Sequence, residues 1–176
     1  MVNYRRNRVA GGTYFFTVTL RNRRADFLTA YFAELKLALR ATHQEKPFET
    51  VAMVVLPQHL HVVWTLPAED ADYENRWRKI KSHFTQLLLK AGVALNQNAR
   101  GEYDLWQARF WEHTIRDERD LQHHVAYIYH NPVKHGWAKN VADWAYSTFH
   151  RDVVRGLFPA NWSADVARMQ QSGIRE

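Results

Sequence analysis

The sequence predicts an α+β domain, in which helices cover an antiparallel sheet, from three features of its 176 residues. Apolar residues make up 46% and charged residues 24%, a globular composition with enough apolar residues to form a core. Stretches rich in β-branched and aromatic residues alternate with stretches that carry apolar residues at helical spacing. The resulting order, β-α-β-β-α-β-α, is typical of such a sheet. We expect one domain over residues 1–176, with a tail from about 163 to 176 that could be flexible.

The first half of the chain contains three expected strands and two expected helices. The strands are expected at 13–20, 48–56 and 59–66, and the helices at 26–43 and 73–90. Pro57 and Gln58 form the turn between the last two strands, which therefore make a hairpin. Gly92 ends the second helix, because glycine readily adopts the conformation that stops one.

A short strand at 110–115 and one more helix follow in the second half. Asp117 is the expected N-cap of this helix, and Asp120 in its first turn interacts favourably with the helix dipole. We expect the helix to end near Asn131, because Pro132 disfavours helical geometry at the residue before it. Mixed structure is expected from Lys134 onward.

The charge and the missing cysteines narrow the chemistry of the protein. A formal charge of +6 and a pI near 9.7 favour a polyanionic partner. The absence of cysteine excludes disulfides, thiolate metal sites and cysteine nucleophiles. No N-terminal stretch has the pattern of a signal peptide, and the longest apolar run, Val51–Leu56, is too short to span a bilayer. We expect a cytoplasmic protein that does not associate with membranes.

Two histidines, His59 and His61, share one face of an expected strand. Residues two apart in a strand point the same way, so the two imidazoles project side by side, while Leu60 and Val62 point into a core. Two adjacent imidazoles make half of a metal site. The same pattern also occurs where two histidines merely lie on a solvated face, so the pattern alone does not establish a metal site.

The last expected helix places one tyrosine beside an asparagine. At about 100° per residue, Tyr127, His124 and Asn131 lie along one flank, and Tyr129 lies on the opposite flank. Only Tyr127 can therefore share a site with Asn131. A phenol, with a pKa near 10, is a weak nucleophile that a metal-charged site can activate for phosphoryl transfer. The alternative is two half-buried tyrosines and a capping asparagine. The apolar stripe expected to pack on the body of the protein consists of Leu121, Val125 and Ile128.

Basic residues lie next to aromatic ones at three places in the chain. Such clusters can contact phosphates, while the aromatic rings stack on unpaired bases. Solvated surface charge is the alternative for any single residue, but the set as a whole favours a nucleic acid. The candidate DNA contacts are Arg5, Arg6, Arg8, Arg21, Arg23, Arg24, Arg78, Lys79 and Lys81, with Arg76 on the same helix as the last three.

The chain resembles the REP-associated tyrosine transposases, a branch of the single-tyrosine HUH transposases, where HUH stands for His-hydrophobic-His. Five blocks match in order and span about residues 4–165. The blocks are Gly11–Val18, Val54–Trp64, Trp106–His113, Tyr127–Gly136 and Asp143–Arg151. The stretch Leu88–Asp104 looks longer and less family-like, which leaves its role in DNA contact open.

This resemblance implies a ferredoxin-like fold of the HUH single-strand nuclease and transposase type. It implies metal-dependent cleavage and strand transfer of single-stranded DNA at REP hairpins, with Tyr127 as the nucleophile that leaves a 5′-phosphotyrosine and a free 3′-OH. His59 and His61 are the implied metal ligands, and Asn131 completes the set. The ion implied is Mg²⁺ or Mn²⁺; two imidazoles suit Mn²⁺ better, but the sequence does not decide. A monomer and a homodimer, in which Tyr127 serves a partner's metal, both stay open.

Two other functions stay open as well. A metal-dependent hydrolase with water as the nucleophile would work without a covalent adduct and survive Tyr127→Phe, although no carboxylate stands near His59 and His61 in the sequence. A non-catalytic DNA-hairpin binder would bind hairpins equally well without the metal and without Tyr127. The intact histidine pair, Tyr127 and Asn131 argue against lost catalysis.

Overall fold

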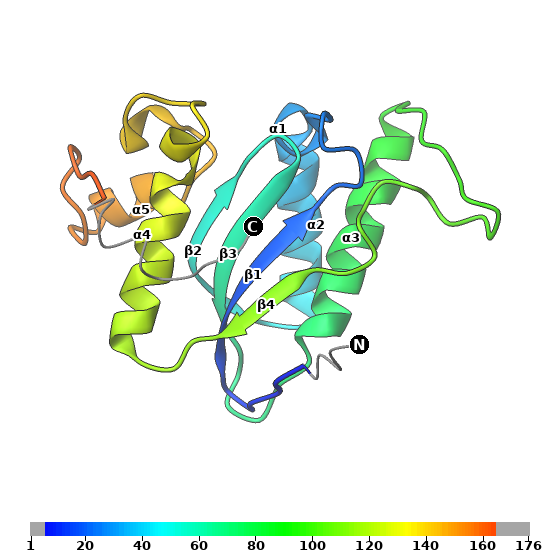
Figure 1. Ribbon diagram of the computed structural model, residues 1–176. Coiled ribbons are helices and arrows are strands. Elements are labelled where there is room, and N and C mark those ends of the chain that lie inside the picture. The colour runs from blue at the N-terminus through cyan, green and yellow to red at the C-terminus, as the bar shows by residue number, and fades with distance from the viewer. Residues whose placement is uncertain (1–5, 165–176) are drawn as a thin grey trace, which may run out of the picture.

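The computed structural model describes residues 6–164, and its central feature is a four-stranded sheet with helices on both faces (Figure 1). The strands are β1 (Thr13–Thr19), β2 (Glu49–Val55), β3 (His59–Thr65) and β4 (Trp111–Thr114). They lie in the order β2-β3-β1-β4, and each neighbouring pair is antiparallel. This is the arrangement of a ferredoxin-like β-α-β-β-α-β fold, so the predicted fold class is confirmed. Arg5 and most of the expected tail lie outside the described residues.

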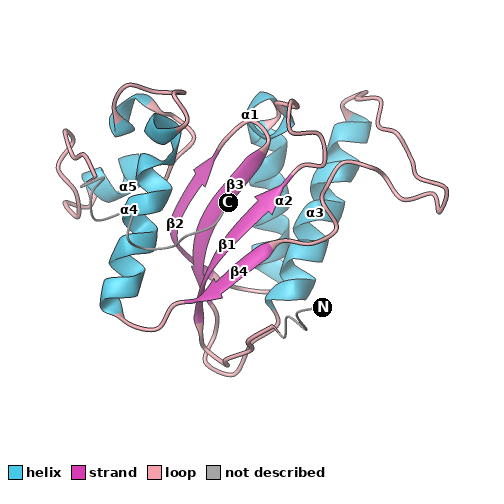
Figure 2. Cartoon of the chain, viewed as in Figure 1, coloured by secondary structure: helices cyan, strands magenta, loops and turns pink. Residues whose placement is uncertain are grey.

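Helices cover the two faces of the sheet unequally (Figure 2). The helices are α1 (Phe27–Ala30), α2 (Phe32–Glu45), α3 (Tyr73–Lys90), α4 (Glu118–Lys134) and α5 (Phe149–Val154), with a 3₁₀ turn η1 (Val141–Asp143). Helices α2 and α3 pack side by side on one face, which holds the larger hydrophobic core. Helix α4 contacts β2 and β3 on the other face. Within residues 6–164, α4 lies on the β2 side of the sheet (Figure 1), and its start contacts Phe15 of β1 and His113 of β4.

The helix expected at 26–43 is two helices, which corrects the prediction. Tyr31 leaves the helical region, with φ −114° and ψ 43°, so α1 ends at Ala30 and α2 begins at Phe32. The break lets α1 dock on the β2–β3 turn, where the N–H of Leu28 donates to the carbonyl of Pro57 and the Leu28 side chain is fully buried. Tertiary packing here outweighs the continuous helical pattern of the sequence.

Helix α4 continues through Pro132 to Lys134, which corrects its predicted end near Asn131. The carbonyl of Asn131 keeps its helical partner, the N–H of His135, at 3.1 Å. The carbonyl of Pro132 accepts the N–H of Trp137 at 2.9 Å, which closes the helix end. Because Pro132 is buried and these bonds are made, the local preference against helix before proline is overcome. The three residues from Pro132 to Lys134 are thereby held in register with the rest of α4.

The segment between α3 and β4 extends away from the sheet (Figure 1). A bridge between Gln97 and Tyr103 closes its outer part, and a second bridge between Leu20 and Trp106 ties its return to the end of β1. Within residues 6–164, no helix has both the length and the apolar character needed to cross a bilayer.

Candidate metal and nucleophile site

Strand β3 places His59 and His61 on the sheet face that α4 partly covers. Both side chains are buried, and their ring centroids lie 4.8 Å apart. The register of β1 puts Thr17 opposite His61, and Thr17 Oγ1 lies 2.8 Å from His61 Nδ1. This hydrogen bond fixes the orientation of the imidazole, in the way that ligand histidines are commonly held. It leaves His61 Nε2 buried, with no hydrogen-bond partner among the described residues.

The protonation state of His61 suits a metal ligand. Burial, together with electrostatic interactions with the neighbouring basic groups of His59, His135 and Lys134, lowers the pKa of His61 well below its usual value. The imidazole is therefore neutral at physiological pH. When its Nδ1–H donates to the hydroxyl of Thr17, the lone pair lies on Nε2, which is the form that binds a cation.

Helix α4 brings Tyr127 to the same place. Its buried ring lies with its centroid 5.2 Å from that of His61 and 6.0 Å from that of Phe15. Phe15, on β1, also contacts the rings of His61 and His124. The Phe15 side chain therefore sets the spacing between the tyrosine-bearing helix and the histidine-bearing strand.

Tyr129 lies on the opposite flank of α4, as its helical position predicts. Its hydroxyl donates to the carboxylate of Asp152 and lies 3.2 Å from Thr148 Oγ1, and its ring packs on Phe149. Burial and the neighbouring Asp152 carboxylate raise the pKa of Tyr129. This tyrosine joins α4 to α5 and does not contact the histidine pair.

The stripe of α4 that faces the sheet differs from the predicted one. His124, Tyr127, Ile128 and Asn131 are buried, whereas the predicted stripe residues Leu121 and Val125 are only partly buried. The flank that the sequence indicated for chemistry is thus the flank pressed against the sheet. Polar side chains are buried there because strands β1 and β3 present polar residues to them.

A row of α4 residues spaced by four runs alongside the histidine pair. Tyr127 contacts His61 at one end of the row, and the ring centroid of His135 lies 5.7 Å from that of His59 at the other. Asn131 lies between them on the same side of the helix. Its side chain is fully buried, and both Oδ1 and Nδ2 have no hydrogen-bond partner among residues 6–164. Asn131 is thus a buried amide on α4 between the two residues that contact His61 and His59.

Sequence reasoning missed four residues of this neighbourhood. Thr17 and Phe15 are recognisable only from the register between strands, which a single sequence does not show. Lys134, whose Nζ lies 5.2 Å from the centroid of the Tyr127 ring, and His135 both fall in the matched block Tyr127–Gly136. The expectation that the helix ends near Asn131 hid their alignment with Tyr127.

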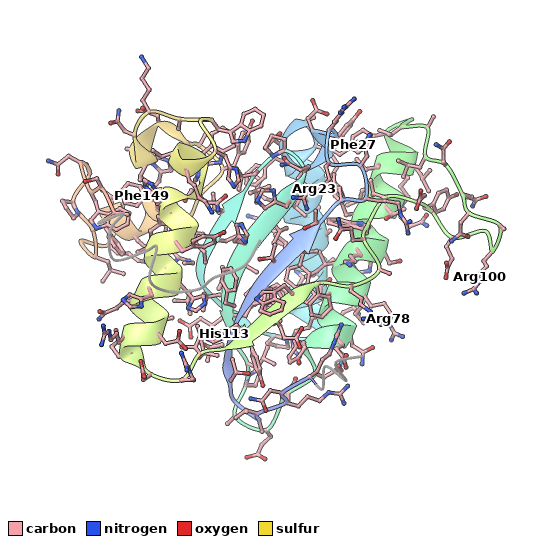
Figure 3. The ribbon with its side chains drawn as sticks, in the orientation of Figure 1. Arg23, Phe27, Arg78, Arg100, His113 and Phe149 are labelled. Atoms are coloured by element: carbon pink, nitrogen blue, oxygen red, sulfur yellow. The ribbon has the colours of Figure 1, made fainter. Side chains whose placement is uncertain are left out.

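A second group of possible ligands joins β4 to α4. His113, Asp120 and His124 offer ligand atoms that all lie within 4.8 Å of one another, and Figure 3 shows His113 beside the start of α4. His113 Nε2 lies 2.9 Å from Asp120 Oδ2, and the backbone N–H of Arg116 donates to the same oxygen at 3.0 Å. Burial opposes ionisation of Asp120, but these hydrogen bonds outweigh it and lower the pKa of Asp120 to about 2.

The ring arrangement of this second group suits a structural clamp. The rings of His113 and His124 stack at 4.7 Å with only 17° between their planes. An imidazole binds a metal in its ring plane, and planes this close to parallel do not meet within about 2.1 Å of both rings. A metal shared by both histidines would require one ring to turn. In the arrangement seen, the anionic Asp120 holds the first turn of α4 against β4.

The predicted DNA-contact residues are dispersed over the surface. Figure 3 shows Arg23 near the end of β1 and Arg78 on the outer side of α3. Several of these residues are paired within the protein: Arg6 and Arg8 with Glu74, Arg21 with Asp104, Lys79 with Glu45, and Arg78 with Asn75. Arg23 and Arg24 are exposed in the loop after β1. Their roles in DNA contact stay predictions.

Two basic residues of α3 point inward. Arg76, which the sequence groups with the basic residues of the same helix, is fully buried and therefore does not belong to a basic surface. Its guanidinium donates to the Asp70 carboxylate at 2.7 Å and to the Pro47 carbonyl at 2.6 Å, so it ties α3 to the preceding loops. Lys81 Nζ donates to the carbonyl of Gln107 at 2.8 Å, and burial lowers the pKa of Lys81 to about 8.

Comparison with known proteins places the chain in a family. No protein-family model matches it. It is 52% identical over 166 residues to the REP-associated tyrosine transposase of Escherichia coli strain K12, across 94% of this chain and 93% of that relative. A Haemophilus influenzae relative is 46% identical over 167 residues, across 94% of this chain and 95% of the relative. A solved REP-associated tyrosine transposase bound to a REP hairpin superposes with a TM-score of 0.84 at 51% identity, across 94% of this chain and 93% of that one. The chain therefore belongs to the REP-associated tyrosine transposases.

Proposed function

We propose that this protein cleaves and rejoins single-stranded DNA at REP-type hairpins, through a 5′-phosphotyrosine on Tyr127 and with a divalent metal ion. The observation that carries the proposal is that Tyr127 lies beside buried polar atoms of His61 and Asn131 that have no hydrogen-bond partner within residues 6–164. Burying such an atom without a partner costs about 1–3 kcal/mol. Its retention beside a tyrosine supports a site that binds something there. The relative solved with a REP hairpin supports the class of DNA.

The donor set fits the predicted metal. A nitrogen of His59, Nε2 of His61 and Oδ1 of Asn131 provide two imidazole nitrogens and one amide oxygen, and His61 is neutral. Mixed nitrogen and oxygen donors suit Mn²⁺, and Mg²⁺ accepts them with water in its remaining positions. A bound ion of this kind would polarise a phosphate oxygen and lower the barrier to attack at phosphorus.

Tyr127 has the role of nucleophile. Its phenol oxygen forms a bond to phosphorus, and the bond from phosphorus to the 3′ oxygen breaks. The phenol loses its proton and the departing 3′ oxygen takes one up, which gives a 5′-phosphotyrosine and a free 3′-OH. A 3′-OH that attacks the ester reverses these steps and restores Tyr127. The ester keeps the energy of the broken bond, so rejoining requires no ATP.

Neighbouring side chains hold Tyr127 in position. Phe15 and His61 contact its ring from the sheet. Lys134 places a positive charge 5.2 Å from the ring centroid, on the helix side. A cation at this distance favours an anionic phosphate over a neutral ligand at the same spot.

Covalent trapping tests the proposal. The protein is mixed with end-labelled single-stranded REP-hairpin DNA and Mn²⁺ or Mg²⁺, and the products are separated on a denaturing gel. We expect a shifted protein–DNA band that disappears with a chelator and falls by at least about 10³-fold in Tyr127→Phe. Hairpin affinity of Tyr127→Phe should stay within about twofold, because only one hydroxyl oxygen is lost.

Tyr129→Phe is the matched control, because it removes the same atom from the same helix on the other flank. It should retain most of the adduct while losing about 1–3 kcal/mol of stability, since Asp152 loses a buried hydrogen bond. Cleavage without an adduct would instead indicate a hydrolase that uses water. Tight hairpin binding without any cleavage would indicate a binding module.

A further inference from the structure

Trp111 lies on the same face of the sheet as the histidine pair. It is the first residue of β4, and the register places it directly opposite Thr17, which is itself opposite His61. Residues directly opposite one another in a sheet project from the same face. His113, two residues further along β4, confirms the direction, because its ring stacks on His124 of α4. With strands about 4.8 Å apart, Trp111 stands about 10 Å across the sheet from His61.

This tryptophan is exposed where the other large rings of the sheet are buried. Its side chain is 41% exposed, whereas Phe15 on the neighbouring strand is fully buried. Helix α4 packs mainly on β2 and β3 (Figure 1), and its start reaches β4 at His113, two residues along the strand from Trp111. Within residues 6–164, the other exposed aromatic side chains lie off this face: Tyr103 in the extended segment and Trp137 beyond the end of α4.

A nucleotide chain can connect the two positions. Bases that neighbour a phosphate held between Tyr127 and His61 can reach the edge of the sheet, because consecutive backbone units of a single strand are several ångströms long. An exposed indole offers a flat apolar ring on which any base can stack, and such stacking is a common way of holding unpaired nucleotides. The edge of the sheet would thus hold a base while the centre holds the reacting phosphate.

We propose that Trp111 is a stacking platform for the base of a nucleotide that flanks the scissile phosphate. This inference rests on the proposed function, and it adds a positioning contact that fixes the unpaired strand across the sheet. The occupant is an unpaired nucleobase. Because every base has a flat π face, Trp111 contributes to placement more than to base identity.

Binding measured with abasic DNA tests the platform without requiring catalysis. The Tyr127→Phe protein is the parent, so that DNA is bound but not cut. Hairpin oligonucleotides carry one abasic site at a time at each unpaired position beside the stem. We expect Trp111→Ala to weaken binding of the intact hairpin by about 5- to 100-fold, the range for loss of one stacked base. On the one hairpin whose abasic site removes the stacked base, Trp111→Ala should bind as tightly as the parent protein. The ring then has no base to contact, so removing the ring costs no further affinity.

Two variants serve as controls. Trp111→Phe keeps a ring and should restore most of the affinity, which separates stacking from a general effect on the edge strand. Trp137→Ala removes a tryptophan that is 51% exposed and lies off the sheet face. Any affinity that this variant loses should be the same on the intact hairpin and on the abasic hairpin for which Trp111→Ala shows no loss. Thermal unfolding of each variant confirms that it is folded at the assay temperature.

The possible results separate the two proposals. The stacking proposal would be wrong if Trp111→Ala lost the same affinity on every abasic hairpin, or lost none on the intact hairpin. It would also be wrong if Trp111→Phe bound no better than Trp111→Ala. These results leave hairpin binding and covalent chemistry at Tyr127 intact. A parent protein that binds none of the hairpins would contradict the proposed function itself.

Discussion

The two faces of the sheet are built from the same strands and differ in what they bury. On the α2 and α3 face, Trp64 and Trp77 stack with centroids 4.3 Å apart and Phe16 packs against both. On the α4 face, the buried residues include His61 and Asn131, whose side chains have polar atoms with no hydrogen-bond partner among the described residues. The first face also leaves the indole N–H groups of its tryptophans without a hydrogen bond in the described part of the chain. Each indole offsets that cost by burying a large apolar ring.

This difference separates stability from chemistry. One face has large rings that gain free energy from burial. The other holds polar atoms whose burial costs free energy unless a ligand satisfies them. Alternation along β1 and β3 allows both, because adjacent residues point to opposite faces. Substitutions on the two faces should therefore have opposite profiles for folding and for reaction.

The largest contrast should come from two residues of β3 that face opposite sides of the sheet, Trp64 and His61. Trp64→Ala removes a fully buried indole and should destabilise the protein by about 3–5 kcal/mol. His61→Leu replaces a buried polar ring with an apolar side chain and should change stability by no more than about 1 kcal/mol, while abolishing the metal-dependent adduct. Urea denaturation and covalent trapping measure the two effects. Equal destabilisation by both substitutions would show that the faces do not differ in this way.

A smaller contrast should come from the charged group that anchors each face. Arg76→Met breaks a buried network on the α3 side and should cost about 2–3 kcal/mol, below the value for fully buried pairs because Asp70 is partly exposed. Below its melting temperature, that variant should form adduct normally. Asp120→Asn should cost only about 1–2 kcal/mol but slow adduct formation by about tenfold, because it loosens the helix that carries Tyr127. Normal adduct formation in Asp120→Asn would show that the contacts of Asp120 are not needed to position Tyr127.

The smallest effect should be the dependence of stability on pH. Burial lowers the pKa of His61, His124 and His130, all from β3 and α4. Below about pH 6.5 the unfolded chain binds protons at these sites that the folded protein does not, so stability is lost as the pH falls. Each group contributes up to about 1.4 kcal/mol per pH unit in that range. In urea titrations between pH 6.5 and 5, the free energy of unfolding of His61→Leu should fall less steeply with pH than that of the unmodified protein. An unchanged slope would show that other groups cause the pH dependence.

Part of the candidate site could be predicted from spacing alone. The two-residue spacing put His59 and His61 on one face, and the four-residue spacing put Asn131 beside Tyr127 and apart from Tyr129. The N-cap of α4 was equally local, and Asp117 does accept the N–H of Asp120 at 2.8 Å. The roles of these residues stay proposals until the adduct is measured.

Other features depend on contacts that are distant in sequence. The bond from Thr17 to His61 requires the β1–β3 register, and the burial of Arg76 requires acceptors 29 or 30 residues away. The continuation of α4 past Pro132 overrode a correct local preference. The spread of the basic residues also followed from folding, because Arg6, Arg21 and Lys79 pair with three different acidic residues.

By itself, the sequence determined the order of the elements, the alternation of the strands and the flank of α4 that carries Tyr127, because these depend on the geometry of a few consecutive residues. Only the tertiary structure decided that Tyr127 contacts His61 beside Phe15, that the Asn131 amide is buried without a hydrogen bond in the described part of the chain, and that Trp111 faces the same side as His61. Those relations depend on strand register and helix docking. The free energy that fixes register and docking comes from burial summed over the whole core, and no short segment contains it.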